Sequence, residues 1–404
     1  MIEKIVIIGA GQAGAQAAVS LRHGGYKGAI TMIGAEAAPP YQRPPLSKAY
    51  LKGDLDEHRL YLRGAEFYEA QSVALHLGMR ATAIDRAAKT VITDSGESFS
   101  YDALLIATGA PPRQIACPGA GLDGVHYLRT LADSERLRPL LMAPGRIVIV
   151  GAGYIGLEVA AVARQEGRAV TVLEMAPRVL ARVASEPVSA FYENLHRSAG
   201  VDLRLGAALE GFEGEKRIDG VRLGGGETID CIAALVGIGA APELTLAKEA
   251  GLAIDNGIVV DEHARTSDPQ IFAAGDCANF PSPRYGRRMR LESVPNAIEQ
   301  AKAAAANMVG GAVVYDALPW FWSDQYDVKL QTVGLSEGYD ELVVRGDPAE
   351  KKFGVWYLKD GKALAVDAIN DPASFAMGKK LIASGAALYA KQLGDVSVDL
   401  RTLG

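Results

Sequence analysis

The sequence predicts an α/β protein with two doubly wound parallel-sheet domains, followed by a small α+β domain. Three observations predict this fold class. Apolar runs at residues 5–8 and 146–150 each lead directly into a glycine-rich turn and a helical stretch. After about Leu318 the pattern changes to short strands around Asp360-Gly361, a dipeptide typical of tight hairpins. A chain of 404 residues also exceeds one hydrophobic core, so several domains are expected.

The composition is that of an ordinary folded protein. Hydrophobic residues make up 49% of the chain and the net charge is -6, which excludes the strong basicity of a nucleic-acid binder. Neither a charged leader nor an apolar run long enough for a membrane span is found, so we expect a cytoplasmic protein. Cys117, Cys231 and Cys277 show neither Cys-x-x-Cys nor zinc-ligand spacing, so we expect no disulfide framework and no metal site.

Both apolar runs end in the same glycine spacing. In each copy the first glycine permits a tight turn, the second lets the backbone approach a pyrophosphate, and the third lets the helix pack against the strand. The helix N-terminus then offers unpaired N–H groups to the phosphates. One copy could arise for packing alone, but two copies in this context predict two Rossmann-like dinucleotide-binding domains. The glycines are Gly9, Gly11 and Gly14 in the first turn and Gly151, Gly153 and Gly156 in the second.

Acidic residues follow the second strand of each expected domain. The strand expected at 169–173 ends in Glu174, where a carboxylate can accept hydrogen bonds from both hydroxyls of an adenine ribose. A 2′-phosphate would meet this negative charge, so the second site is predicted to prefer NADH over NADPH. Glu36 follows the strand expected at 30–33 at a later offset and is the corresponding candidate. Both residues could instead be solvated strand-end carboxylates.

A glycine-aspartate element assigns a nucleotide to each turn. An apolar run and Gly275 precede Asp276, and with this element the chain resembles the two-dinucleotide-binding flavoprotein superfamily, which has a glutathione reductase-like fold. The resemblance implies FAD at the first turn, with Asp276 holding its ribityl chain, and NADH at the second turn. The alternative role of Asp276 is a helix N-cap before Cys277. Crossover strands are expected to end at Thr108, Gly109 and Gly239.

Four further segments narrow the resemblance. Residues 41–48 (YQRPPLSK), 151–158 (GAGYIGLE), 291–297 (LESVPNA) and 321–326 (FWSDQY) look like ferredoxin reductases of bacterial oxygenase systems, and the likeness spans essentially the whole chain. It implies cofactor contacts for Arg43, Lys48, Ile155, Glu158, Val294 and Trp322.

The implied roles differ. Arg43 and Lys48 are expected to contact FAD, with Lys48 near the flavin, and Glu158 is expected to face the nicotinamide end of NADH. Trp322 is the candidate aromatic group between the flavin edge and a partner. The alternatives are surface positions for the two cations and a core position for Trp322.

The cysteine pattern restricts the function. Disulfide reductases of the superfamily carry a reactive cysteine beside the flavin, but residues 36–60 contain none. Cys277 is expected to be a small buried residue at a helix start. Together with this absence, the resemblance implies hydride transfer from NADH to FAD, then single-electron transfer to a two-iron, two-sulfur ferredoxin that serves a haem monooxygenase or a ring-hydroxylating dioxygenase. The alternatives are a redox-sensing flavoprotein resembling apoptosis-inducing factor and an NADH oxidase or peroxidase.

One basic stretch is a candidate docking surface. Cations crowd residues 284–290 of an otherwise acidic chain, and such a patch would steer an acidic ferredoxin. A solvated loop without a partner is the alternative. The cations are Arg284, Arg287, Arg288 and Arg290.

Turn residues near 111 and 241 mark the expected domain junctions. A monomer or weak dimer is expected. The predicted domains are an FAD domain of residues 1–111 and 241–318, an NADH domain of residues 112–240, and a C-terminal domain of residues 319–404. Within the last domain, a hairpin is expected at 353–358 and 362–366, and a helix at 376–383.

Overall fold

A computed structural model describes residues 2–403 of the chain. The chain forms two compact units, which are described separately. The first unit comprises Met1–Gln42, Asp56–Pro111 and Ala240–Ala317. The second unit comprises Arg43–Leu55, Pro112–Gly239 and Leu318–Gly404. The short segment Arg43–Leu55 therefore packs with the second unit, although residues of the first unit flank it on both sides.

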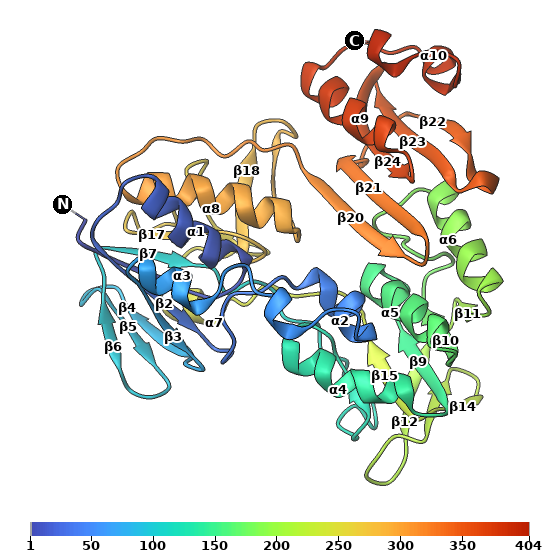
Figure 1. Cartoon of the computed structure of the whole chain (residues 1–404), viewed down its shortest axis with the longest axis horizontal. Coiled ribbons are helices and arrows are strands. Elements are labelled where there is room, and N and C mark those ends of the chain that lie inside the picture. The colour runs from blue at the N-terminus through green and yellow to red at the C-terminus, as the bar shows by residue number, and fades with distance from the viewer. Residues whose placement is uncertain (1, 404) are drawn as a thin grey trace. The chain divides into compact units, whose positions relative to one another are not determined.

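A five-stranded parallel sheet forms the core of the first unit. Its strand order is β17-β7-β1-β2-β3, and four of the five residues of β1 are buried. Helices α1 (Gln12–His23) and α8 (Val294–Met308) lie side by side against this core (Figure 1). The strands are β1 (Lys4–Ile8), β2 (Ala29–Gly34), β3 (Val73–Leu77), β7 (Ala103–Ile106) and β17 (Ile271–Ala273).

Smaller elements complete the first unit. Strands β4 (Ala81–Asp85), β5 (Thr90–Thr93) and β6 (Ser98–Ser100) form an antiparallel sheet, and β16 (Ile258–Val259), β18 (Ala278–Ser282) and β19 (Arg287–Met289) form another small sheet. The short helices are η2 (Glu57–Arg59), α3 (Ala65–Ala70) and α7 (Thr245–Glu249).

The helix start expected at Cys277 is wrong. Strand β18 begins at the next residue, because the Ile258 N–H donates to the Cys277 carbonyl and starts the parallel pairing of β16 with β18. An N-cap role for Asp276 is therefore excluded as well. Cys277 is fully buried, as expected.

The second unit repeats the parallel architecture. Its sheet has the order β11-β10-β9-β15-β8, and β9 pairs with β10 as β1 pairs with β2. The strands are β8 (Val125–His126), β9 (Arg146–Val150), β10 (Ala169–Glu174), β11 (Asp202–Leu205) and β15 (Ala233–Val236), and a small sheet contains β12 (Leu209–Glu213), β13 (Gly220–Leu223) and β14 (Thr228–Asp230). The helices are η1 (Pro44–Ser47), α2 (Ala49–Lys52), α4 (Leu131–Met142), α5 (Tyr154–Gln165) and α6 (Glu186–Ser198).

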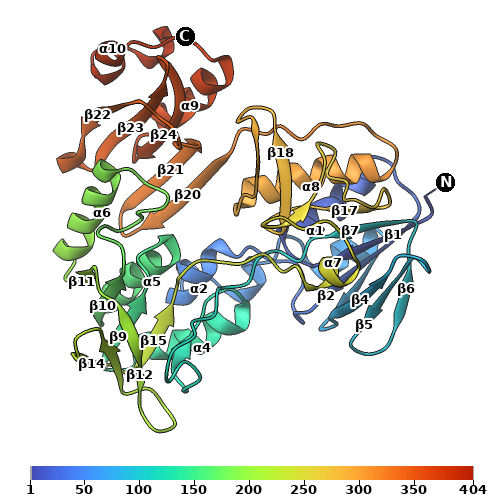
Figure 2. The same cartoon turned by 180° about the vertical axis from the view of Figure 1, so that it is seen from behind.

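An antiparallel sheet of order β20-β21-β24-β23-β22 completes the second unit, and helix α9 packs against it (Figure 2). The predicted hairpin is confirmed: Asp360 and Gly361 have φ of 50° and 69°, as a tight turn between β23 and β24 requires. The predicted helix is also present and longer. The elements are β20 (Trp320–Gln325), β21 (Val328–Gly334), β22 (Glu341–Asp347), η3 (Pro348–Glu350), β23 (Lys352–Lys359), β24 (Lys362–Ile369), α9 (Pro372–Ser384), α10 (Ala390–Gly394) and η4 (Leu400–Thr402).

Two parallel-sheet folds and a small α+β region confirm the predicted fold class. Across residues 2–403, no helix combines the length and apolarity that crossing a membrane requires. Within the same residues, the structure contains no cluster of three or more His, Cys, Asp or Glu side chains arranged to hold a metal ion.

Candidate dinucleotide sites and a buried lysine–glutamate pair

The first glycine of each turn is required by the backbone. Gly9 has φ of 112° and Gly151 has φ of 104°, both in the region that favours glycine. A Cβ on Gly9 would lie 2.2 Å from the carbonyl oxygen of Ala107, and one on Gly151 would lie 2.4 Å from that of Gly237. Each turn thus crosses directly over the end of the neighbouring strand.

The third glycine of each turn allows the helix to approach the turn. A Cβ on Gly14 would lie 1.9 Å from the Gly9 carbonyl oxygen, and one on Gly156 would lie 2.2 Å from that of Gly151. Only glycine lets α1 and α5 pack this closely.

The second glycine of each turn faces open space. Apart from its chain neighbours, a Cβ on Gly11 or Gly153 would meet no atom of the described residues within 4 Å, although both residues cap the N-terminus of a twelve-residue helix. This is the cradle that a pyrophosphate would fill, with helix N–H groups at its base. Both turns therefore fit a dinucleotide.

Glu174 binds the backbone of the second turn. At the carboxyl end of β10, its Oε2 accepts from the Ala152 N–H at 2.8 Å and its Oε1 accepts from the Ala176 N–H at 2.8 Å. The carboxylate is thus oriented beside the phosphate cradle, where a ribose would lie. In the first unit Glu36 lies two residues beyond β2, and its Oε2 accepts from the Tyr41 hydroxyl at 2.5 Å.

The other expected FAD ligands gather at one edge of the first sheet. Strands β1, β7 and β17 are adjacent and parallel, so their carboxyl ends meet at the same edge. Thr108, Gly109 and Asp276 follow β7 and β17 at that edge, and Gly109 has φ of 73°. The Thr108 hydroxyl donates to the Glu243 carbonyl at 3.1 Å. Val294, also expected to contact FAD, is the half-buried first residue of α8.

Lys48 and Glu158 form an ion pair inside the second unit. The Lys48 Nζ lies 2.6 Å from Glu158 Oε2, and the exposed fractions of the two side chains are 19% and 4%. The Ser47 hydroxyl donates to the same oxygen at 2.5 Å, and the Ser323 hydroxyl donates to Oε1 at 2.6 Å. Both carboxylate oxygens are therefore satisfied although the group is buried.

Two contacts fix the segment that carries Lys48. The Arg43 guanidinium donates to the Arg129 carbonyl at 2.6 Å, and the Ser134 hydroxyl donates to the Leu46 carbonyl at 2.9 Å. Arg43 is thus not a free surface cation. One turn before Glu158, Ile155 is 45% exposed at the start of α5, which leaves an apolar surface at the mouth of the second turn.

Trp322 lies on the opposite face of β20 from Ser323. It packs on Trp320 with ring centroids 5.6 Å apart, and both side chains are half-buried. Phe321, on the Ser323 face, instead packs on Tyr154 at 4.6 Å. Trp322 thus belongs to a partly exposed aromatic pair.

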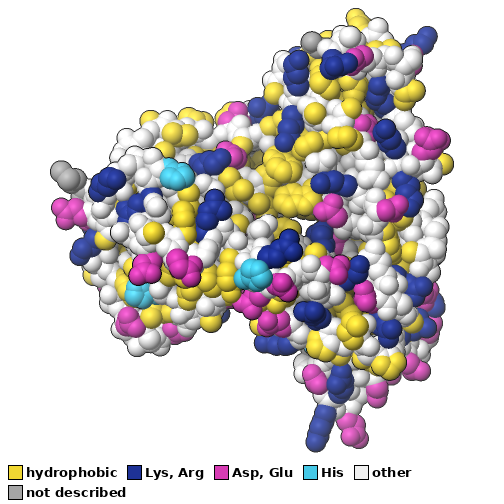
Figure 3. All heavy atoms as spheres, in the orientation of Figure 1, with side chains coloured by type: hydrophobic (Ala, Val, Ile, Leu, Met, Phe, Trp, Pro, Cys, Tyr) yellow, Lys and Arg dark blue, Asp and Glu magenta, His cyan; other side chains and the backbone are white. Residues whose placement is uncertain are grey.

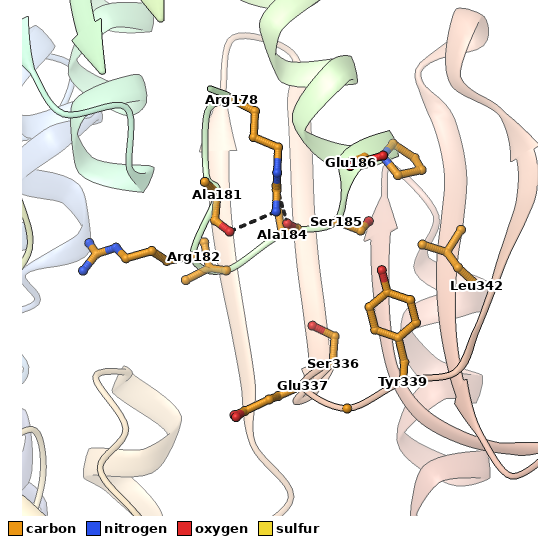
Figure 4. Close-up of a pocket in the computed structure, with 13 residues that line it drawn as sticks. Arg178, Ala181, Arg182, Ala184, Ser185, Glu186, Ser336, Glu337, Tyr339 and Leu342 are labelled. Atoms are coloured by element: carbon orange, nitrogen blue, oxygen red, sulfur yellow. Dashed lines mark hydrogen bonds between the residues drawn. The ribbon is translucent and has the colours of Figure 1, made fainter. Parts of the chain in front are cut away.

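A cavity of about 570 Å³ opens beside the loop that follows β10 (Figure 4). Arg178 shapes this loop by donating to the Ala184 carbonyl and the Ser189 hydroxyl, both at 2.6 Å. Arg182 extends away from Arg178 in the close-up, and its guanidinium lies 3.2 Å from where a Cβ on Gly239 would be. Gly239 has φ of 102° and accepts from the Arg113 N–H.

Three polar residues at these sites are not predicted from the sequence. Arg182 follows Glu174 by eight positions, and a cation there is the only sequence signal it offers. Ser47 and Ser323 lie inside the segments 41–48 and 321–326, but nothing in their spacing predicts that both donate to Glu158.

The basic stretch divides into structural and exposed cations. Arg290 is 9% exposed and pairs with Glu292 at 2.6 Å. Arg288 donates to the carbonyls of Val260 and Asn279, and Arg284 lies 3.9 Å from an Asp316 carboxylate oxygen. Arg287 is exposed. On the face shown in Figure 3, basic and acidic side chains are interspersed rather than gathered in one large patch.

All three cysteines are free thiols. Burial raises the pKa of the Cys231 thiol to about 12, and it also raises the pKa of Cys117 and of Cys277. Burial therefore favours the protonated thiol at neutral pH in all three cases and disfavours a reactive thiolate.

The chain has two parallel sheets, each with a glycine turn that fits a dinucleotide. This arrangement defines an oxidoreductase that binds two nucleotides. Residues 3–301 match the pyridine nucleotide-disulphide oxidoreductase family, and residues 320–404 match the reductase C-terminal family. The chain belongs to the pyridine nucleotide-disulphide oxidoreductase family, whose cofactors are FAD and NAD(P)H.

Two curated relatives align along nearly the whole chain. Putidaredoxin reductase CamA of Pseudomonas putida is 45% identical over 99% of this chain and 96% of its own length. The probable ferredoxin reductase CtmF of Castellaniella defragrans is 45% identical over 99% and 98%.

Two solved structures are also similar to this chain over nearly its whole length. The covalent putidaredoxin reductase–putidaredoxin complex contains a chain that superposes with a TM-score of 0.96 at 45% identity, covering 99% of this chain and 98% of that one. A ferredoxin reductase from Rhodopseudomonas palustris gives a TM-score of 0.96 at 43% identity, covering 99% of both chains.

Proposed function

We propose that this protein is an NADH-dependent ferredoxin reductase that passes electrons to a two-iron, two-sulfur ferredoxin of an oxygenase system. One observation carries the proposal. Both glycine turns have the geometry of a pyrophosphate cradle, in a chain that aligns end to end with ferredoxin reductases. The buried, protonated thiols favour a ferredoxin over a disulfide as the acceptor.

Each turn receives one cofactor in this proposal. The Gly9–Gly14 turn, with Glu36, Thr108, Gly109, Asp276 and Val294, would hold FAD. The Gly151–Gly156 turn, with Ile155, Glu174 and Gly239, would hold NADH. When bound, FAD accepts a hydride from NADH and passes its electrons on singly, which is chemistry that the protein side chains do not supply.

The protein's contribution is binding and alignment. Glu174 offers the ribose an oriented carboxylate and repels a 2′-phosphate. Arg182 is added as a candidate for the pyrophosphate charge because its guanidinium lies beside Gly239. Arg43 and Lys48 keep the proposed role of contacting FAD. The Lys48–Glu158 pair presents one fixed cation and one fixed anion to the cofactors without transferring a proton.

Each compact unit offers its own candidate contact for the electron acceptor. Arg287 is exposed in the basic stretch and would steer an acidic partner, with Arg284 and Arg288 adding positive charge beside it. Trp322 is the proposed aromatic contact between the flavin and the partner. The terminal enzyme would be a haem monooxygenase or a ring-hydroxylating dioxygenase, as the anthranilate dioxygenase reductase component of Burkholderia cepacia illustrates for one relative. A cytoplasmic location fits three free thiols.

The test uses the purified yellow protein. Anaerobic titration with NADH should bleach the flavin absorbance with one equivalent of NADH per flavin, and stopped-flow mixing with candidate ferredoxins should restore it. A polypeptide that retains no flavin would refute the proposal. Rapid reoxidation by a disulfide or peroxide but not by any ferredoxin would favour an oxidase or peroxidase. Slow NADH oxidation that no ferredoxin accelerates would favour a redox-sensing flavoprotein.

A further inference from the structure

Strand β20 presents two different faces. Phe321, Ser323 and Gln325 share one face, since side chains alternate along a strand. Phe321 packs on Tyr154 of α5, while the exposed fractions of Ser323 and Gln325 are 0% and 1%. Two polar side chains are thus buried where apolar ones would avoid a desolvation cost, so their hydrogen bonds require an explanation.

A hydrogen-bonded chain connects these side chains to Glu158. The Ser323 hydroxyl donates to Glu158 Oε1 at 2.6 Å, and Gln325 Nε2 donates to the Ser323 hydroxyl oxygen at 3.2 Å. Gln325 Oε1 lies 2.8 Å from His196 Nε2, and His196 Nδ1 lies 3.3 Å from the Tyr326 hydroxyl. The chain therefore runs from the β20–β21 turn to the carboxylate of the ion pair.

The orientation of each group is determined by its neighbour. The Ser323 hydroxyl has one hydrogen, which goes to the carboxylate, so it must accept from the Gln325 amide. The other end of that amide is then an acceptor, and His196 must donate to it from Nε2. Nδ1 is left unprotonated and accepts from Tyr326. All four bonds donate toward Glu158.

His196 is held neutral at physiological pH. Its side chain is fully buried in α6, and burial lowers its pKa from 6.5 to about 4. An imidazolium would donate from both nitrogens and could not accept from Tyr326. Neutrality therefore keeps the direction of the chain fixed.

The hydrogen-bonded chain ends at one carboxylate oxygen of Glu158, Oε1. Ser47 and Lys48 bind Oε2, whereas Ser323 is the group that binds Oε1. Hydrogen bonds to both oxygens restrict rotation of the carboxylate, which in turn restricts the position of the Lys48 ammonium. Removing the Ser323 hydroxyl would leave a buried oxygen without its donor and free the carboxylate to turn.

We propose that Ser323, Gln325 and His196 are positioning residues that orient the Glu158 carboxylate, and through it Lys48, toward the bound cofactors. This inference rests on the proposed function, and it assigns a purpose to the polar residues of the FWSDQY segment. None of the three needs to touch a cofactor.

Three variants and one matched control test the proposal. Ser323→Ala removes the donor to Glu158, Gln325→Met removes the link to His196 in nearly the same volume, and Ser323→Thr retains the hydroxyl. The control is Ser374→Ala, because Ser374 is equally buried in α9 and its hydroxyl has no hydrogen-bond partner among residues 2–403.

Stopped-flow flavin reduction by NADH provides the first readout. Ser323→Ala should lower the limiting rate constant roughly tenfold or more, since a hydrogen bond to a buried charge is lost, with the apparent Kd for NADH within about twofold. Ser323→Thr should recover most of the rate, and Ser374→Ala should leave it unchanged. Equal rates in the wild type, Ser323→Ala and Gln325→Met would overturn the proposal. A rate loss matched by loss of FAD and of thermal stability in both variants would also overturn it.

The second readout does not depend on cofactor reduction. Nitrogen-15 NMR of the histidine-labelled holoprotein, which has six histidines, should show His196 protonated at Nε2 alone down to about pH 5. Gln325→Met should change this tautomer ratio, and Ser374→Ala should not. Protonation of His196 at Nδ1 in the wild type would refute the proposed direction of the hydrogen bonds. If NADH does not reduce the wild-type flavin, the proposed function is wrong. The tautomer of His196 still tests whether the hydrogen-bonded chain from Tyr326 to Glu158 exists.

Discussion

Lys48 and Glu158 are 110 residues apart in sequence, yet their charged groups approach to 2.6 Å within the second unit. Lys48 follows a short helix that two prolines begin, and Glu158 lies in the second turn of α5. The pair joins the Arg43–Leu55 segment to α5, the helix that follows the second glycine turn. Because Glu158 is 4% exposed, the pair should contribute to stability in addition to its proposed contact with the cofactors.

Removing one member of the ion pair should lower the free energy of unfolding more than replacing both members with neutral side chains. Lys48→Met leaves a buried carboxylate without its counter-ion, so we expect destabilisation of about 3 kcal/mol. The double variant Lys48→Met with Glu158→Gln should recover at least half of that loss because no unpaired charge remains. Thermal unfolding midpoints of the flavin-loaded proteins provide the measurement. A double variant less stable than Lys48→Met would contradict the buried-charge explanation.

Substitution of the second glycine of each turn, Gly11 or Gly153, should weaken cofactor binding without affecting folding. Gly153→Ala adds a methyl group in open space, so stability and FAD content should remain close to wild type. The same methyl group would occupy the proposed pyrophosphate cradle, and we expect the Kd for NADH to rise at least tenfold. Gly11→Ala should instead reduce FAD retention. Fluorescence titration with NADH and flavin release measure the two effects.

The third glycines provide the control for this prediction. A Cβ on Gly14 or Gly156 would lie within 2.2 Å of a backbone oxygen, so alanine there should lower the unfolding midpoint of the apoprotein. Equal stability of Gly11→Ala and Gly14→Ala would show that the open space beside Gly11 is not available.

Glu174 should determine the nucleotide preference. Glu174→Gln removes the negative charge but retains an oxygen that can accept from Ala152, so the turn should persist. We expect kcat/KM for NADH to fall roughly tenfold because hydrogen bonds to a charged acceptor weaken. The value for NADPH should rise, since the repulsion of its 2′-phosphate is removed. An unchanged NADH to NADPH ratio would exclude the ribose role.

Local rules account for the features that the sequence predicts well. The spacing of Gly9 and Gly151 predicts both turns because each glycine meets a steric demand within a few residues. Alternation around Asp360-Gly361 predicts the hairpin for the same reason. The position of Glu174 at the end of β10 is predictable because the apolar run before it marks a buried strand.

Contacts between distant segments are not encoded locally. The Ser323 hydroxyl reaches Glu158 across 165 residues, and nothing in either segment identifies the other. The prediction of a helix start at Cys277 is wrong for the same reason, because the residues that follow pair with the distant strand β16. Arg290 also looks like its exposed neighbours in sequence, although its side chain is 9% exposed.

Arg287 should matter for the partner and not for NADH. Arg287→Glu should lower kcat/KM for ferredoxin reduction about tenfold at low ionic strength, and the difference should shrink as salt screens the patch. Dye reduction by NADH should not change. Lys216→Glu, the same charge reversal on an exposed residue of the second unit, is the control. Equal losses in both variants would indicate a net-charge effect rather than a docking site.

His196 should make the fold sensitive to mild acid. Its pKa is about 4 in the folded protein because of burial, whereas the unfolded chain binds a proton near the ordinary value of 6.5. The stabilising effect of the neutral ring is therefore complete above pH 6.5 and is lost as the pH falls toward 4, by at most about 3 kcal/mol. His196→Gln should lose less stability than wild type across this window, whereas the exposed control His23→Gln should follow wild type. Unfolding midpoints measured from pH 4 to 8 test this, and since carboxylates titrate in all three proteins, the difference between the curves is the informative quantity. Parallel curves for wild type and His196→Gln would mean that folding does not lower the pKa of His196, and the burial explanation for a neutral ring would then be wrong.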